Sequence, residues 1–198
     1  MFQPLARPSR PAVTLASALM LTVWLAIGAT TAPAHPGPHH GRPDHEPEAT
    51  TDLRRARAAT RAFRDIDAAR AAGYAATGEC VEDPKYGAMG IHYANPELVA
   101  DGVLDVTKPE ILVYQPTRRG KLRLGAIEYF QVDADQDLAT DDDRSSLFGM
   151  PFDGPMLGHD AEMPIHYDLP VWLYRHNPAG LFAMWNPNVS CPDGEHGA

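Results

Sequence analysis

The chain has 198 residues, with 17 Lys and Arg against 26 Asp and Glu and a formal net charge of −9. This length fits one domain, and the acidic balance argues against a protein that binds nucleic acid, which needs a basic surface. Two Cys exclude an all-cysteine zinc site, which takes four, and a dense disulfide scaffold. The nine His make metal binding a function to consider, because imidazole is the commonest metal ligand.

Residues 1–34 have the pattern of a secretory leader. Arg7 and Arg10 are their only charged side chains, an apolar stretch follows, and residues 32–34 read Ala-Pro-Ala. These features predict a signal peptide cleaved after Ala34, and therefore a secreted or periplasmic protein. The alternative is an uncleaved leader that anchors the protein in a membrane, since the apolar stretch approaches the length of about 20 residues that a spanning helix needs.

The remainder of the chain divides into three parts. Residues 35–50 are rich in His, Pro and Gly and predict a disordered tail with solvated histidines. Residues 51–191 are expected to form a single α+β domain, and residues 192–198 a loose C-terminus. Five of the nine histidines fall in the two tails, so only four belong to the domain. These four are His92, His159, His166 and His176.

The domain begins with a helical pattern. From Thr51 to Ala72 the chain has no Pro or Gly, and apolar residues recur at steps of three and four. This spacing predicts one amphipathic helix, capped by Thr51 or Asp52 and ended by Gly73. Six arginines lie mostly off the apolar stripe, and acidic residues are interleaved with them. The interleaving favours a solvated helix surface over an anion-binding face.

Short apolar segments after the helix predict strands. Residues 110–115 and 121–132 are rich in β-branched and aromatic side chains, and residues 171–174 form a further short strand pattern. The loop 118–120 places Gly120 in the left-handed position that three-residue hairpins use. The predicted fold is therefore α+β, with an N-terminal amphipathic helix packed on a mainly antiparallel curved sheet or partial barrel.

The hairpin loop predicts which residues face each other. If Thr117 pairs with Lys121, Glu110 lies directly opposite Glu128, with Cβ atoms about 5 Å apart. The other residues of this face are mainly apolar, so both carboxylates need a shared proton, a cation or a metal. A shift of one residue in the register would move Glu128 to the opposite face and remove this argument.

Two histidines complete the candidate metal site. His92 and His166 are expected to join Glu110 and Glu128 as ligands, with His176 in reserve. Imidazole and carboxylate ligands of this kind suit zinc, iron, manganese or copper. The sequence therefore predicts a small exported binding domain whose partner is a small ligand or a transition metal ion.

Two other functions fit the same residues. A metal-dependent hydrolase or oxidoreductase would use one carboxylate as a general base toward a metal-bound water. A purely structural domain would satisfy the two glutamates with an arginine or a shared proton and bind no ligand. The sequence specifies neither the ligand nor the oligomeric state.

The two cysteines, Cys80 and Cys191, are 111 positions apart. In an exported protein they are expected to form a disulfide that joins the segment after the helix to the end of the domain. The competing interpretation is a thiol nucleophile or a metal ligand.

Several motifs resemble, as a set, an uncharacterised group of bacterial exported proteins. They include Gly-Ala-Met-Gly-Ile-His-Tyr at 87–93, Pro-Glu-Ile-Leu-Val-Tyr at 109–114, and the ending at 177–191. The resemblance extends over nearly all of residues 51–191. It implies export but no particular activity, so no catalytic residue is carried over from it.

The chain departs from this group at one position. Members of the group often read Leu-His-Val-Trp where this chain reads Leu-Pro-Val-Trp at 169–172. The resemblance implies that Pro170 removes one candidate metal ligand here, unless His166 substitutes for it.

Overall fold

The computed structural model describes residues 48–117, 119–158 and 163–192, all within one compact unit. The predicted signal peptide, most of the predicted tail, His159 and residues 193–198 lie outside these ranges. Within the described residues, no helix is long and apolar enough to span a membrane.

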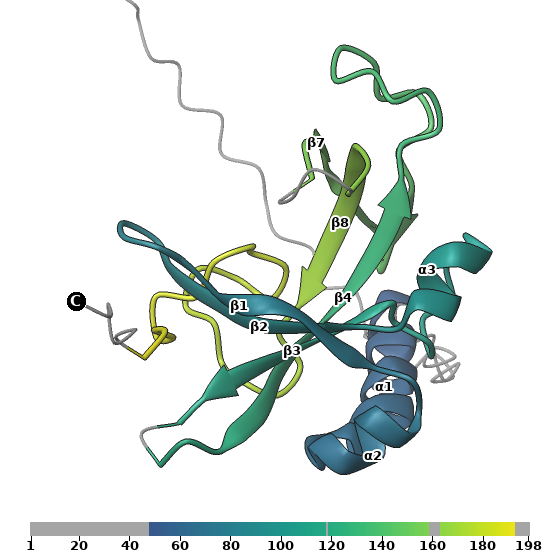
Figure 1. Cartoon of the computed structure of the whole chain (residues 1–198). Helices are drawn as coiled ribbons and strands as arrows, with labels where there is room; N and C mark the ends of the chain where they lie inside the picture. Colours follow the sequence, from purple (N-terminus) through teal and green to yellow (C-terminus); the bar gives the residue numbers. More distant parts are fainter. Residues whose placement is uncertain (1–47, 118, 159–162, 193–198) are drawn as a thin grey trace, which may run out of the picture. The chain divides into compact units, whose positions relative to one another are not determined.

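An antiparallel sheet forms the centre of this unit. The strands are β1 (Ala75–Asp83), β2 (Gly87–Ala94), β3 (Ile111–Pro116), β4 (Leu122–Val132), β5 (Ser146–Leu147), β6 (Met150–Pro151), β7 (Asp153–Met156) and β8 (His166–Val171). Six of them pair in the order β1-β2-β3-β4-β8-β7, while β5 and β6 pair separately. Figure 1 shows that the sheet is curved, with β1 and β2 running across β4 and β8. The predicted α+β class with a mainly antiparallel curved sheet is confirmed.

The N-terminal segment is helical but is not one helix. It consists of α1 (Glu48–Thr60), the 3-10 helix η1 (Arg61–Arg64) and α2 (Ile66–Ala71). Because α1 already begins at Glu48, the predicted cap at Thr51 or Asp52 is wrong. Gly73 does follow the end of α2, with a φ of +93°. A further helix, α3 (Pro96–Asp101), follows β2 and begins after Asn95, whose side chain caps it.

Contacts with the rest of the fold explain the break between α1 and α2. Thr60 is fully buried and its hydroxyl donates to the carbonyl of Ala56 at 2.7 Å. The carbonyl of Phe63 accepts the Tyr114 hydroxyl of β3 at 2.6 Å. Asp65 then adopts an extended conformation and caps α2 by accepting the N–H of Asp67. The contact between Phe63 and Tyr114 joins residues 51 positions apart, so helical periodicity does not reveal it.

Strand β8 ends at Val171, the first residue of the predicted strand 171–174. After Val171, the N–H of Trp172 donates to the carbonyl of Leu181 at 2.9 Å rather than to a strand. The prediction of a strand over 171–174 is therefore wrong. Pro170 is tolerated inside β8 because β7 pairs with β8 only as far as Asp168, which leaves that side of Pro170 without a partner strand.

A bulge interrupts the hairpin of β3 and β4. Near the loop the register follows the prediction. The N–H of Thr117 donates to the carbonyl of Lys121, the N–H of Lys121 donates to the Thr117 hydroxyl oxygen, and Gly120 has a φ of +69°. Beyond the pair Tyr114–Leu124 the register shifts by one residue, and Val113 faces Ala126. Gly125 is the additional residue of β4.

Two buried clusters cover the two faces of the sheet. One contains apolar residues of α1 and α2 together with Leu112, Tyr114, Ile127 and Tyr129 of the sheet; we call it the helix-side cluster. The other, which we call the C-terminal-side cluster, joins the sheet to the segment 172–191. Its buried members are Ala88, Met89, Ile111, Val113, Ala126, Phe130, Trp172 and Val189.

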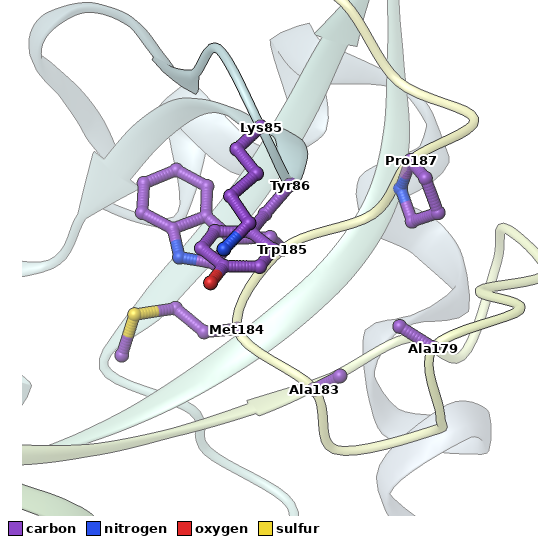
Figure 2. A pocket seen from close by; sticks show the side chains of 7 residues that line it. All are labelled: Lys85, Tyr86, Ala179, Ala183, Met184, Trp185 and Pro187. Carbon is purple, nitrogen blue, oxygen red and sulfur yellow. The ribbon is translucent and has the colours of Figure 1, made fainter.

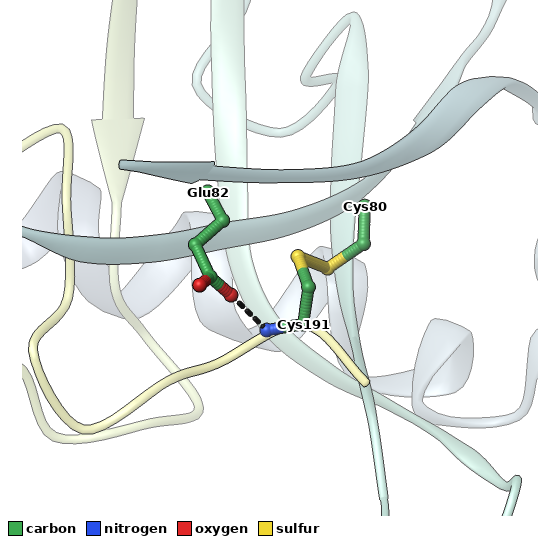
Figure 3. The surroundings of a disulfide bond; sticks show 3 residues. All are labelled: Cys80, Glu82 and Cys191. Atoms are coloured by element: carbon green, nitrogen blue, oxygen red, sulfur yellow. Dashed lines mark hydrogen bonds between the residues drawn. A yellow bond between two sulfur atoms is a disulfide. The ribbon is translucent and has the colours of Figure 1, made fainter. Parts of the chain in front are cut away.

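A disulfide holds the C-terminal segment on its face of the sheet. Figure 3 shows the bond between Cys80 of β1 and Cys191, with Glu82 accepting the backbone N–H of Cys191. The predicted disulfide is confirmed. Because it closes a loop with a sequence separation of 111, the chain-entropy model gives a stabilisation of about 4 to 5 kcal/mol.

The bulge gives a direct test of the packing around Gly125. A Cβ at this position would overlap the side chain of Gln115, so Gly125→Ala is expected to destabilise the fold by about 1–3 kcal/mol in urea unfolding. Gly78→Ala is the matched control, since no atom lies within 4 Å of a Cβ placed there. Equal effects of the two substitutions would contradict the packing described for the bulge.

Candidate functional site

The only contact between predicted ligands in the described residues joins His92 and Glu128. His92 of β2 pairs with Val113, and Glu128 of β4 pairs with Ile111, so both side chains share the face of the C-terminal-side cluster. The His92 Nε2 lies 3.3 Å from the Glu128 Oε2, and the two side chains are 13% and 4% exposed. The arrangement is a largely buried imidazole–carboxylate pair.

Burial and charge act in opposite directions on His92. Burial disfavours the imidazolium, but the negative charge and close contact of Glu128 outweigh it, so the pKa of His92 lies above its ordinary value of 6.5. The negative charge of Glu128 therefore favours the protonated form of the His92 imidazole.

Asp168 is a third ionisable group on this face. It pairs with Phe130 of β4 and with Asp153 of β7, and it is 3% exposed. Burial is the main cause that raises the pKa of Asp168 well above its ordinary range, and the charges of Glu128 and Asp153 raise it further. Burial and the neighbouring carboxylates therefore favour the neutral form of Asp168. Asp168 was not predicted as a site residue, because the strand pattern was expected to begin three residues after it, at Val171.

Two oxygens of this cluster lack hydrogen bonds. Within the described part of the chain, neither the Glu128 Oε2 nor the Asp168 Oδ1 accepts a hydrogen bond, although both are buried. The Glu128 Oε2 has only the electrostatic contact with His92. Buried acceptors without donors carry a desolvation cost that a proton or a bound cation would remove.

The structure places Glu110 in different surroundings. Its Oε2 accepts the backbone N–H of Phe130 at 3.1 Å. Burial is the main cause that raises the pKa of Tyr74 and Tyr129 in the helix-side cluster, and the charge of Glu110 raises both further. The residue opposite Glu128 is Ile111 rather than Glu110. The predicted pairing of the two glutamates is therefore wrong, because the bulge at Gly125 shifts the register by one residue.

The other predicted ligands do not contact the pair. His166 is 1% exposed, its ring stacks on Phe130 with centroids 4.8 Å apart, and its Nδ1 lies 3.1 Å from the carbonyl of Pro164. His176 is exposed. Among the described residues, no three His, Cys, Asp or Glu side chains stand close enough together to hold a metal ion as they are.

An apolar pocket lies apart from this cluster. Figure 2 shows that it lies between the turn joining β1 to β2 and the loop that carries Trp185. Its volume is about 310 Å³, and the Nζ of Lys85 lies 4.7 Å from the centroid of the Tyr86 ring. None of the predicted ligands lines this pocket.

The cluster of His92, Glu128 and Asp168 offers one imidazole and two carboxyl groups to a cation or a proton. Comparison of the chain with protein-family models, with curated proteins and with solved structures finds no match.

The surroundings of Glu110 predict a pH-dependent stability. Burial, partly offset by hydrogen bonds from backbone N–H groups, raises the pKa of Glu110 from 4.5 to about 7. The pKa of Glu110 is higher in the folded state than in the unfolded state. The contribution of Glu110 to the free energy of unfolding is therefore fully present below about pH 4.5 and is lost as the pH rises through 7. The loss is on the order of 3 kcal/mol. Glu110→Gln, measured by urea unfolding, should therefore gain stability over the wild type at pH 8 but not at pH 4.

Glu97→Gln is the matched control for this measurement, because Glu97 is exposed in the first turn of α3. A pH dependence in Glu110→Gln equal to that of the wild type would show that Glu110 is not the group responsible.

Proposed function

We propose that this chain is a small exported binding domain that takes up a divalent transition metal ion at His92, Glu128 and Asp168. The observation that carries the proposal is the buried pair of His92 and Glu128, together with two buried carboxylate oxygens, the Glu128 Oε2 and the Asp168 Oδ1, that accept no hydrogen bond. One imidazole nitrogen and two carboxylate oxygens form a ligand set suited to zinc, manganese or iron. The disulfide is in keeping with export to an oxidising compartment.

Binding would require two changes in the cluster. The ligands must lose their protons, so His92 would become neutral and Asp168 would ionise as the metal enters. The side chain of Asp168 would also have to turn toward the His92–Glu128 pair, since the three groups do not yet surround one point. We therefore expect the metal affinity to fall as the pH is lowered.

The N-terminal helices support this arrangement from the other face. In the proposal, the amphipathic segment 48–71 packs on the helix-side cluster and holds the sheet in its curved form. The C-terminal segment covers the face that carries the cluster and limits the access of water to it.

The metal proposal is tested by titrating the purified, metal-stripped protein with Zn²⁺ or Mn²⁺ in a calorimeter. Glu128→Gln should weaken binding at the site at least tenfold, because the variant loses a carboxylate ligand. Glu110→Gln should bind as the wild type does. It is a matched control, since Glu110 is an equally buried glutamate on the same hairpin but with different neighbours.

The His-rich segment 35–45 contains side chains that also bind metals, so the difference between the two variants decides the test rather than total uptake. Equal affinities of Glu128→Gln and Glu110→Gln would contradict the proposal.

One observation favours a second candidate, a purely structural role for the cluster. The negative charge of Glu128 already favours a protonated His92 beside it, and burial favours the neutral form of Asp168. In this case, Glu128→Gln would leave metal uptake unchanged and lower the free energy of unfolding, because the buried imidazole of His92 would lose its charged partner.

A further inference from the structure

A second hollow, distinct from the pocket of Figure 2, is lined by arginines. Its volume is about 620 Å³, and it lies where the helical segment meets the beginning of β4. Its lining residues are Arg57, Arg64, Asp65, Arg123, Leu124 and Tyr174. The helix pattern alone favoured a solvated arginine surface. The structure adds a third arginine from β4, which the sequence spacing does not place near the other two.

Arg57 is held in place by the fold. Its Nη1 donates to the carbonyl of Leu173, and its guanidinium carbon lies 4.9 Å from the centroid of the Tyr174 ring. Tyr174 is itself fixed, because its hydroxyl donates to the carbonyl of Arg57 and its N–H donates to Gly125 at the bulge. The guanidinium is therefore positioned before any ligand arrives.

The other two arginines are available to a ligand. Arg64 and Arg123 are exposed, and neither forms an ion pair with another residue in the ranges that the structure describes. Asp65 is the one carboxylate among the lining residues, and its Oδ1 accepts the N–H of Asp67. Three positive charges against one negative charge leave a local positive excess in a chain whose net charge is −9.

We propose that this hollow binds a compact oxyanion that carries two or more negative charges, such as a phosphate or a dicarboxylate. Guanidinium groups recognise both because their planar N–H groups match pairs of anionic oxygens. Leu124, which is 6% exposed, adds an apolar wall that excludes water from one side of the bound anion. The site is separate from the metal cluster and does not depend on it.

The test uses inorganic phosphate and succinate as separate probes, at an ionic strength held constant with NaCl and at a pH near 7.5. Binding is followed by calorimetry and by NMR of the arginine side chains. Both Arg64→Ala and Arg123→Ala are expected to weaken binding about tenfold, since each removes charge-assisted hydrogen bonds. Neither residue has a partner in the described fold, so thermal unfolding should show that both variants remain folded.

Arg61→Ala is the matched control, because it removes the same charge from the same helical segment but does not line the hollow. Saturable binding of either probe that is weakened by Arg64→Ala and Arg123→Ala but not by Arg61→Ala supports the proposal. The probe that binds more tightly distinguishes a phosphate site from a carboxylate site. Absence of saturable binding of both probes, or an equal loss in Arg61→Ala, would overturn it.

Discussion

A single additional residue in β4 determines which side chains share a face of the sheet. Without Gly125, the alternation of side chains would bring Glu110 and Glu128 together, as the hairpin loop alone predicts. With it, Glu128 faces Ile111 and lies beside His92, while Glu110 bonds to the backbone of Phe130. The bulge therefore exchanges a repulsive pair of carboxylates for an attractive pair of opposite charge, which costs much less to bury.

The same residue connects the sheet to the C-terminal segment. The carbonyl of Gly125 accepts the N–H groups of Tyr174 and Arg175 at 3.0 and 3.1 Å. Tyr174 then contacts Arg57 and Thr60 of α1. The bulge thus affects both proposed sites. It sets the register at Glu128, and it positions the ring of Tyr174 next to the Arg57 guanidinium. The disulfide closes the segment at its far end.

The features that could be predicted from the sequence are those that depend on neighbours in the chain. The loop before Lys121, the two strands of the hairpin and the pairing of Cys80 with Cys191 follow from turn chemistry, β-propensity and cysteine count. The glycine inside the strand pattern of 121–132 was the available signal for a bulge, since an isolated Gly in a strand often marks one.

Other features depend on contacts between distant segments and could not be predicted in this way. The break after Thr60 follows from contacts with Tyr114 and Tyr174. Residues 166–171 pair with β4, so strand β8 begins at His166 and Asp168 lies within the sheet. Local pattern favoured the more apolar residues 171–174 as the strand, which is why Asp168 was not recognised as part of the site.

The pairing of His92 with Glu128 is tested most directly by NMR titration of the His92 ring in the wild type, in Glu128→Gln and in Glu110→Gln. The structure predicts that the pKa of His92 lies above 6.5 in the wild type, because the charge of Glu128 outweighs burial. In Glu128→Gln only burial remains, so the pKa of His92 should fall below 6.5, whereas Glu110→Gln should leave it unchanged. A pKa of His92 that responds to Glu110→Gln and not to Glu128→Gln would contradict the register described here.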